Sequence, residues 1–480
     1  MLFSSTVFIL RFLPVFLIVY YIAPKKFRNY VLLLGSLIFY AIGEPVYIFL
    51  LMLSVGLNYY FARKIETFSV ESKDTNEAGQ RKKWFLLGLF YNIGLLIFFK
   101  YMDFFIENIN TLIRLGSEKA DSAFQLPLLK LSLPLGISFF TFELLAYLIN
   151  VYNKKTIAEK SLIKFGTYVC MFPQLLSGPI VIYDDIREAI DNRKYSVVLI
   201  EDGFKLFIIG LGYKVLLANK LSSVWTEIQT IGFTSISTSL AWIGAFSYSL
   251  QLYFDFAGYS LMAIGVGKML GFKIPKNFNQ PYSAKSVTDF WRRWHMTLTA
   301  WFREYIYIPL GGNRKGKIRT IFNMLVVWLI TGFWHGANWN FILWGFVLFL
   351  FMVTEKLFLK KYLDKSRILS RIYIVIVIPF TWILFAITNL SDLLVYVRRM
   401  FSFGFNYGNH YVFQNDFIYF GKSYGLLLLI AILMATPYPA KLYKKIRNNI
   451  FGILLLFAVF WMCIYQISIA SNNPFMYFRF

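Results

Sequence analysis

Runs of apolar residues separated by short polar segments recur along the 480-residue chain. A helix needs about 20 apolar residues to cross roughly 30 Å of hydrocarbon. Hydropathy therefore predicts about eleven to thirteen transmembrane or re-entrant helices. The expected segments are 5–23, 30–43, 45–62, 84–100, 131–151, 161–182, 203–217, 237–266, 320–335, 338–357, 372–390, 422–437 and 450–470.

Glycine and proline interrupt several of these segments, as at Pro173–Pro179 and Pro309–Gly312. Irregular backbone inside a membrane is tolerated only where protein or a water-filled cavity satisfies its polar groups. We therefore expect an all-α polytopic membrane protein whose helices enclose a polar cavity. The sequence contains no internal repeat, low-complexity tract or soluble domain, so residues 1–480 are expected to form a single integral membrane domain.

The composition agrees with a lipid-embedded protein. The chain is 58% hydrophobic and 15% charged, whereas soluble domains carry about 25% charged residues. Lys and Arg outnumber Asp and Glu by 49 to 25, a formal net charge of +24. In a membrane protein such an excess belongs to cytoplasmic loops that face anionic lipid, so no nucleic-acid partner is expected. Cys170 and Cys463 lie in apolar stretches and predict no disulfide.

The basic residues also predict an orientation. The loops at 25–28, 63–83 and 154–164 are basic, whereas the turn at Gly43–Pro45 has no basic residue. Because cytoplasmic loops are enriched in Lys and Arg, this alternation places the N-terminus outside the cytoplasm. The first apolar segment lacks a basic region before it and is expected to be a retained membrane segment. The region 268–319, with eleven Lys or Arg residues, should face the cytoplasm.

The segment 286–305 is the first of two with candidate chemistry. Ser286 and Asp289 resemble a capping box, after which apolar and aromatic residues recur at three- and four-residue spacing. This pattern predicts one amphipathic helix with a Trp-rich face, and His295 borders that face. Such a helix could anchor the bundle at the membrane interface, with its arginines on lipid phosphates, or contribute to an active site.

The second segment, 329–340, contains His335 at the end of a long apolar run. An ionisable side chain at that depth is costly, and such residues usually face a cavity or a transport pathway. Gly332 and Gly336 allow close approach of the backbone, and Asn338 adds a polar side chain nearby. The alternative is a neutral histidine that is hydrogen-bonded between packed helices.

Other catalytic signatures are absent from the sequence. His295 and His335 are forty positions apart and neither cysteine neighbours a histidine, so no metal-ligand spacing occurs and no metal is expected. No nucleophile elbow, P-loop or dinucleotide-binding motif is present. The third histidine, His410, lies in a Gly-, Asn- and Tyr-rich stretch that is typical of a loop, and we expect no catalytic role for it. The simplest chemistry is therefore a histidine that acts as a general base.

These two segments resemble the membrane-bound O-acyltransferase family, in particular the bacterial branch typified by the alginate O-acetylation membrane protein. The most specific pieces are Trp-Arg-Arg-Trp-His at 291–295 and Phe-Trp-His-Gly at 333–336. The resemblance extends along nearly the whole chain, through 1–29, Phe39–Pro45, Phe172–Ile180, Gln251–Ser260, Ile308–Arg314 and Asn473–Phe480.

The resemblance implies a ring of tilted helices around a thin core that is pierced by a central tunnel. It maps the catalytic histidine of the family onto His335 and the second characteristic position onto His295. We expect the residues around them to bind the donor or the acceptor substrate, namely Trp291, Arg292, Arg293, Trp294, Arg303, Trp334 and Asn338.

The implied reaction moves an acyl group, expected to be acetyl, across the bacterial cytoplasmic membrane. The donor would be a cytoplasmic thioester such as acetyl-CoA, with its phosphates on the basic region 268–319. The acceptor would be a hydroxyl of an extracytoplasmic polysaccharide, or a partner protein, such as a hydrolase-like one, that delivers the group. His335 would be the base, and His295 would orient the donor or stabilise the oxyanion. No bound cofactor is expected, and a shared site requires the two imidazole rings to lie within about 12 Å.

Two other functions fit the same sequence features. A transporter or flippase would also have broken helices and a central cavity, but Asp255 is the main buried carboxylate candidate and has no obvious acidic partner. A non-catalytic membrane subunit that docks a cell-surface transferase is the second alternative, although the presence of both histidines argues against it.

Overall fold

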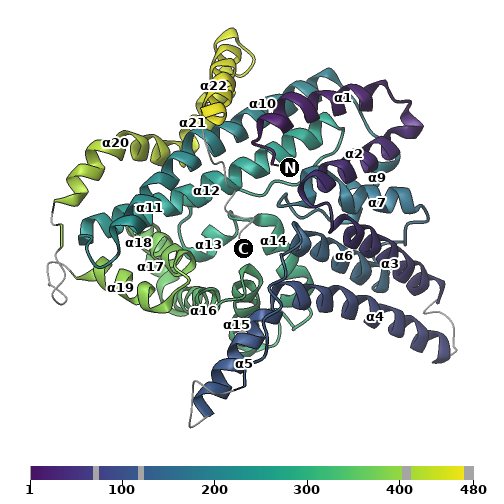
Figure 1. Cartoon of the computed structure of the whole chain (residues 1–480), viewed down its shortest axis with the longest axis horizontal. Helices are drawn as coiled ribbons and strands as arrows, with labels where there is room; N and C mark the ends of the chain where they lie inside the picture. The colour runs from purple at the N-terminus through teal and green to yellow at the C-terminus, as the bar shows by residue number, and fades with distance from the viewer. Residues whose placement is uncertain (1, 69–74, 117–123, 403–411, 414, 470–480) are drawn as a thin grey trace. The chain divides into compact units, whose positions relative to one another are not determined.

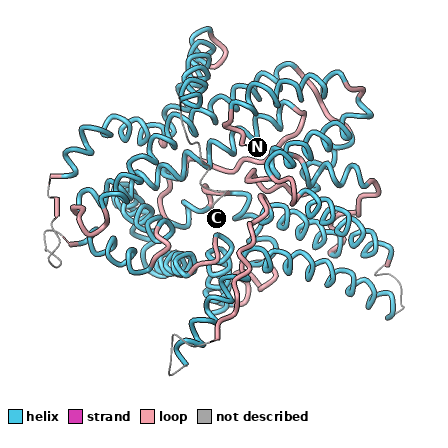
Figure 2. The backbone as a smooth tube through the Cα atoms, in the orientation of Figure 1, coloured by secondary structure: helices cyan, strands magenta, loops and turns pink. Residues whose placement is uncertain are grey.

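The computed structural model of the chain describes residues 2–68, 75–116, 124–402, 412–413 and 415–469. Within these residues all regular structure is helical, with connecting loops and no strands (Figures 1 and 2). The all-α fold class expected from the sequence is therefore confirmed. The contacts divide the chain into two compact units, and the single domain expected from the sequence stays a prediction.

The first unit comprises residues 10–196 and 270–274. Its α3, α4 and α6 pack against one another, and α2 packs on α7. The helices are α1 (Leu13–Ile22), α2 (Arg28–Gly43), α3 (Ile48–Thr67), α4 (Thr75–Lys100), α5 (Met102–Gly116), α6 (Ile137–Tyr152), α7 (Leu162–Cys170), α8 (Phe172–Leu175) and α9 (Tyr183–Asp191).

Helix α6 forms the core of this first unit, because nearly all of its side chains are buried. Helices α3 and α4 are joined by a reciprocal pair of amide hydrogen bonds between Asn58 and Asn92, at 3.2 and 2.7 Å. In an apolar surrounding, such paired amides hold helices together because each satisfies the other's donor and acceptor. The break predicted at Pro173–Pro179 is present, since α7 ends at Cys170 and the short α8 follows.

The second unit comprises residues 2–9, 197–269 and 275–480, of which residues 403–411, 414 and 470–480 lie outside the described part. Its α10 and α11 follow one another along the chain, and both pack against α12 (Figure 1). Its helices are α10 (Val197–Gly212), α11 (Asn219–Ile231), α12 (Thr238–Met269), α13 (Val287–Trp291), α14 (Met296–Phe302), α15 (Gly316–His335), α16 (Trp339–Thr354), α17 (Lys360–Lys365), α18 (Arg367–Ala386), α19 (Leu390–Phe401), α20 (Asp416–Met434), α21 (Pro437–Ile446) and α22 (Ile450–Ile469).

The long helix α12 is the core of the second unit and is buried along most of its 32 residues. At 1.5 Å per residue it is about 48 Å long. A π-helical segment, η4 (Tyr213–Ala218), continues α10 and places Lys214 against α12. There Lys214 forms a buried ion pair with Asp255, with 2.6 Å between the charged atoms.

Glycines set the spacing between α15 and α16. A Cβ added at Gly332 would lie 2.3 Å from the carbonyl oxygen of Phe341, and one added at Gly345 would lie 2.4 Å from that of Trp328. The two backbones are therefore closer than any side chain would allow, as in other membrane helix pairs. This contact holds the end of α15, and with it His335, against α16.

Seven helices among the described residues are long and apolar enough to cross a membrane. They correspond to α3, α4, α15, α16 with its continuation to Lys365, α18, α20 and α22, and two shorter apolar helices lie at Phe8–Ile22 and Ile137–Tyr152. The chain is thus a multi-pass membrane protein. The ring and tunnel implied by the resemblance stay predictions.

Replacing Gly332 by Ala should destabilise the purified protein, because the new methyl group would overlap the Phe341 carbonyl. Overpacking of this kind costs about 1–3 kcal/mol. A thermal-unfolding series in one detergent should show a lower midpoint for Gly332→Ala. The matched control is Gly425→Ala in α20, where an added Cβ meets nothing within 4 Å. The control should match or slightly exceed the wild-type midpoint, because Ala is the better helix former.

Candidate active site

The segment 286–305 is not one helix, and this corrects the prediction from its periodicity. Helix α13 ends at Trp291, α14 begins at Met296, and a π-helical turn, η6 (Arg303–Tyr307), follows. His295 lies at the break with φ +43°, in the left-handed region that a non-glycine residue rarely adopts. Periodicity could not show the break, since the apolar side chains on both sides are buried as they would be in a continuous helix.

The backbone groups released by this break are satisfied by residues 277–279, which run beside it. The Met296 N–H donates to the Asn277 carbonyl at 2.9 Å, and the Asn279 N–H donates to the Arg293 carbonyl at 2.9 Å. Buried backbone groups need such partners because an unmade hydrogen bond in an apolar surrounding costs several kcal/mol. The neighbouring segment therefore makes the unusual conformation of His295 possible.

The N-terminus of α13 is capped from two sides. The Ser286 hydroxyl accepts from the Asp289 N–H at 3.1 Å, as expected of the cap. The Asp289 carboxylate accepts from the Lys285 N–H at 3.0 Å, one residue before the cap, so the reciprocal bond differs from that of a capping box. The carboxylate of Glu355, at the end of α16, accepts from the N–H groups of Val287 and Thr288. A negative charge at this position is favourable because the first turn of a helix carries partial positive charge.

His295 is buried, with 1% of its surface exposed. Its Nδ1 lies 3.1 Å from Oδ1 of Asn277, and its ring packs edge-on to Phe256 with 4.6 Å between centroids. Burial lowers the pKa of His295 to about 3, because an imidazolium would lose its hydration. The ring is therefore neutral at physiological pH.

His335 is the last residue of α15 and is also buried, with 3% of its surface exposed. It lies among the aromatic rings of Trp334, Trp344 and Phe385, at centroid distances of 4.7, 5.1 and 5.2 Å. The C-terminal end of a helix carries partial negative charge, which favours a positive charge on this imidazole when it accepts a proton.

Both histidines contact Trp334. The centroid of the Trp334 side chain lies 6.2 Å from the ring of His295 and 4.7 Å from that of His335, so the two imidazoles are at most about 11 Å apart. This spacing is within the limit that a shared site requires. The catalytic roles of the two residues stay predictions.

Five buried indoles form a cluster that holds this region together. Trp291 lies at its centre, with Trp328, Trp344 and Trp382 at 5.1, 5.4 and 5.7 Å from it. Trp294 packs on Trp382 at 4.9 Å. These contacts join α13, α15, α16 and α18, so the tryptophan cluster fixes the helices that position both histidines.

A cavity of about 600 Å³ lies next to the tryptophan cluster, within the size range of ligand-binding sites. His295 and Trp291 line it, and α15 contributes Met324, Val327, Trp328 and Thr331, which share one helical face. Thr331 is one helical turn before His335. The cavity thus follows α15 almost to the second histidine, although His335 itself does not line it.

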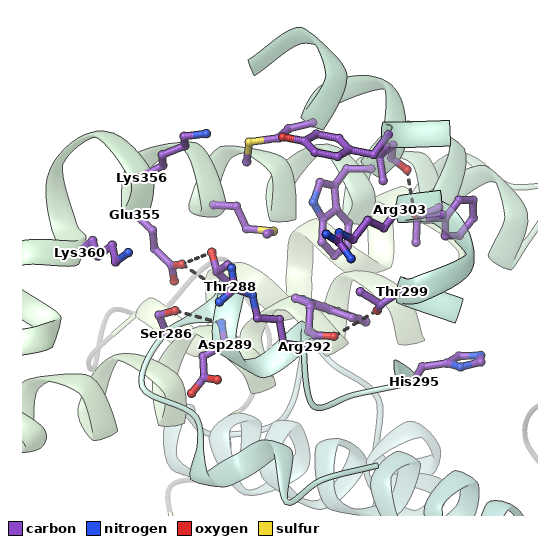
Figure 3. A pocket seen from close by; sticks show the side chains of 18 of the residues that line it. Ser286, Thr288, Asp289, Arg292, His295, Thr299, Arg303, Glu355, Lys356 and Lys360 are labelled. Atoms are coloured by element: carbon purple, nitrogen blue, oxygen red, sulfur yellow. Dashed lines mark hydrogen bonds between the residues drawn. The ribbon is translucent and has the colours of Figure 1, made fainter. Parts of the chain in front are cut away.

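The other end of the cavity is positively charged. In Figure 3, Lys356 and Lys360 lie at one end of the lining and His295 at the other, with Arg292 and Arg303 between them. Lys285 also lines the cavity. All five cations are exposed, and none forms an ion pair with the residues that the structure describes. We call these five residues, Lys285, Arg292, Arg303, Lys356 and Lys360, the cationic rim.

The structure distributes the predicted site residues unequally. Trp291, Arg292, His295 and Arg303 line the cavity. The others lie beside it: Arg293 pairs with Asp289 at 2.9 Å, Trp294 is buried in the tryptophan cluster, Trp334 separates the histidines, and Asn338 caps α16 by accepting from the Asn340 N–H at 3.4 Å.

Sequence reasoning missed the residues that support the histidines from elsewhere in the chain. Asn277 lies eighteen positions before His295. Lys356 lies in the π-helical segment Glu355–Leu359 that follows α16, and Lys360 is the first residue of α17. In the sequence, Asn277 is marked only as a polar residue in a loop between Pro275 and Pro281. Among the described residues, no group of three His, Cys, Asp or Glu side chains could hold a metal ion.

The fold and the site define an all-helical multi-pass protein with two buried histidines near a cation-rimmed cavity, and the family comparison assigns it to the membrane-embedded transferases. The model of the MBOAT, membrane-bound O-acyltransferase family matches residues 90–397, which include both histidines and the cavity. The chain belongs to this family and is an O-acyltransferase. The transporter and docking-subunit functions considered from the sequence are therefore set aside.

Curated relatives agree over most of the chain. It is 36% identical to the "Probable alginate O-acetylase AlgI" of Azotobacter vinelandii, over 84% of this chain and 79% of the relative. The protein of the same name from Pseudomonas putida is 32% identical over the full length of both chains. The peptidoglycan O-acetyltransferase of Helicobacter pylori is 35% identical, over 83% of this chain and 80% of the relative.

The neutral state of His295 can be measured by nitrogen NMR of protein labelled only at histidine. Because burial holds the pKa near 3, the His295 ring signals should not move between pH 8 and pH 5. The chain has three histidines, so the signal is assigned by its loss in His295→Gln. Protonation of the His295 imidazole above pH 5 would show that the ring is not held in a dry environment.

Proposed function

We propose that this enzyme moves an acetyl group from a cytoplasmic acyl thioester, acetyl-CoA, to a hydroxyl on an extracytoplasmic polysaccharide. The observation that carries the proposal is the cavity, which joins a rim of unpaired cations to a histidine in a dry aromatic surrounding. A thioester donor has phosphates at one end and an uncharged acyl group at the other. The two ends of the cavity match these two parts.

The cationic rim supports a donor that carries phosphates. Arg and Lys form strong charge-assisted hydrogen bonds with phosphate oxygens. Of the three acidic side chains that line the cavity, Asp289 is engaged by Arg293 and Glu355 by the N-terminus of α13. The acidic groups near the rim are thus largely occupied, and the net positive charge is available for a ligand.

His335 is the proposed general base. It would take the proton of the acceptor hydroxyl while the hydroxyl oxygen attacks the thioester carbonyl carbon. As the carbon–sulfur bond breaks, the imidazolium returns the proton to the leaving thiolate, and an ester and a free thiol result. The helix end at His335 favours the transient positive charge, and no acyl-enzyme is needed when both substrates share one site.

Two residues that line the cavity would support this reaction. The Trp291 indole Nε1 is buried and makes no hydrogen bond to the described residues, so it can donate one to a bound substrate. His295 would either orient the donor or stabilise the developing oxyanion. The aromatic surroundings exclude water, which strengthens each of these interactions and limits hydrolysis of the thioester.

The direction of transfer rests on the positions of charge along α15. The residues at its start are basic, and its 20 residues span about 30 Å before His335. With the basic end in the cytoplasm and the N-terminus of the chain outside, His335 would be reached by an acceptor from the extracytoplasmic side. Two of the relatives named above are called alginate O-acetylases and a third a peptidoglycan O-acetyltransferase, which favours a glycan acceptor, delivered directly or through a hydrolase-like partner in the bacterial cell envelope.

Removal of the base should abolish acyl transfer. In nanodiscs supplied with radiolabelled acetyl-CoA and a membrane extract, His335→Ala should lower thioester turnover by at least about 100-fold, the usual contribution of a general base. His410→Ala is the matched histidine control, at a position outside the described residues, and it should keep wild-type turnover. Equal turnover in the two variants would exclude His335 as the base.

The role of the cationic rim can be separated from that of the base by comparing two donors. Arg303→Gln and Lys356→Gln should raise the KM for acetyl-CoA, because each removes a charge from the proposed phosphate site. The KM for an acetyl thioester of a short carrier without phosphates should not change. Lys441→Gln on α21, away from the cavity, is the control and should leave both KM values at the wild-type level. Equal losses with both donors would show that the rim does not bind phosphate.

A further inference from the structure

We infer that Asn277 is the positioning residue of the second histidine: it locks His295 in the Nδ1–H tautomer, so that Nε2 presents a lone pair. His295 would then accept a hydrogen bond from an N–H or O–H of a substrate and could not donate one to the oxyanion. The inference rests on the proposed function, and it chooses between the two roles that the proposal leaves to His295.

The identity of the Asn277 atom beside the histidine is fixed by the main chain. The same atom that lies 3.1 Å from His295 Nδ1 also accepts from the backbone N–H of Thr297 at 3.3 Å and from its hydroxyl at 3.0 Å. A backbone N–H can only donate, so this atom is the amide oxygen. The amide nitrogen is on the other side and donates to the Ser260 hydroxyl at 3.2 Å.

The proton position on His295 follows from that identity. An amide oxygen can only accept, so Nδ1 of the imidazole must donate and carries the proton. A neutral imidazole has one proton, and the ring is neutral because of its burial. Nε2 is therefore the acceptor nitrogen.

Asn277 is held firmly enough to impose this tautomer. It is fully buried, with 0% of its surface exposed. Its amide nitrogen is tied to α12 through Ser260, and its own carbonyl accepts from Met296 N–H in the break. One residue thus supports the left-handed backbone at His295 and sets which ring nitrogen is protonated, much as the orienting group of a catalytic histidine does elsewhere.

This tautomer excludes one role for His295 and favours another. Stabilisation of a tetrahedral oxyanion needs a donor N–H aimed at the oxygen, and the neutral Nε2 has none. A lone pair on Nε2 can orient a group that carries a proton, either an amide N–H of the thioester carrier or the acceptor hydroxyl. The oxyanion would then depend on other donors in the cavity.

The tautomer can be read directly from the nitrogen spectrum of the histidine-labelled protein in nanodiscs at pH 7. For wild type we expect His295 to show a protonated Nδ1 and an unprotonated Nε2, with the assignment taken from His295→Gln. In Asn277→Leu, which keeps the bulk of the side chain and loses the acceptor oxygen, Nε2–H should become populated. A wild-type spectrum with an unprotonated Nδ1 would overturn the inference.

Loss of the Nδ1–H tautomer should also slow acetyl transfer. Asn277→Leu should lower kcat/KM by roughly 10- to 100-fold, the usual effect of removing an orienting partner. The matched control is Asn279→Ala, two residues further along, which removes an exposed side chain and keeps the main-chain N–H that donates to the Arg293 carbonyl. This variant should retain both the wild-type spectrum and the wild-type rate. Wild-type tautomer and rate in Asn277→Leu would exclude Asn277 as a positioning residue.

A conservative variant guards against loss of folding in Asn277→Leu. Asn277→Asp retains an acceptor oxygen, so Nδ1 of His295 should remain protonated. The rate of acetyl transfer by Asn277→Asp should therefore exceed that of Asn277→Leu. An unprotonated Nδ1 in this variant would contradict the inference. The spectra need no turnover, so a wild-type protein that shows the expected tautomer and no acetyl transfer would reject the proposed function and leave the assignment of the tautomer standing.

Discussion

Lipid as a solvent imposes the constraint on which the rest of this structure depends. No water is available in the hydrocarbon region to satisfy backbone N–H and C=O groups, so regular helices are favoured wherever the chain meets lipid. The same constraint makes every break in a helix informative. The break between α13 and α14 persists because residues 277–279 supply the missing hydrogen bonds. A conformation that would be costly in isolation is thus supported by a segment from outside the two helices, at the position where the candidate site needs His295.

The two histidines share a surrounding that is aromatic rather than charged. His335 lies among Trp334, Trp344 and Phe385, and His295 packs against Phe256 and Trp334. Burial of His295 in this environment lowers the pKa of its imidazole, because an imidazolium would lose its hydration there, and so keeps that ring neutral in the resting enzyme. The cations lie at the other end of the cavity. Under the proposed function, the cations would bind the charged carrier of a thioester at one end of the cavity, and its uncharged acyl group would lie at the aromatic end.

The candidate residues of the site could be named from the sequence because histidine is rare in this chain. A chain with three histidines, two of them in apolar surroundings, offers few candidates for a base. The positions of Trp291, Arg292 and Arg303 on the cavity also followed from a single segment. Arg293 and Trp294 did not, since side chains adjacent in sequence point in different directions once the helix is broken. Asn338 lies in another segment, where it caps α16. Arg293 instead pairs with Asp289, and Trp294 joins the tryptophan cluster.

The sequence by itself determined that the protein is embedded in lipid, that it is all-helical and where most of its apolar segments lie, because hydropathy and helical periodicity are local properties. It also determined the break near Pro173, since proline lacks the N–H that a helix needs. Only the tertiary structure decided the break at His295, the partnership with Asn277 and the contributions of Lys356 and Lys360 to the rim. Each of these depends on contacts between residues far apart in the chain, where the energy of a buried hydrogen bond or a packed indole outweighs local preference. The local pattern of residues therefore cannot predict those contacts.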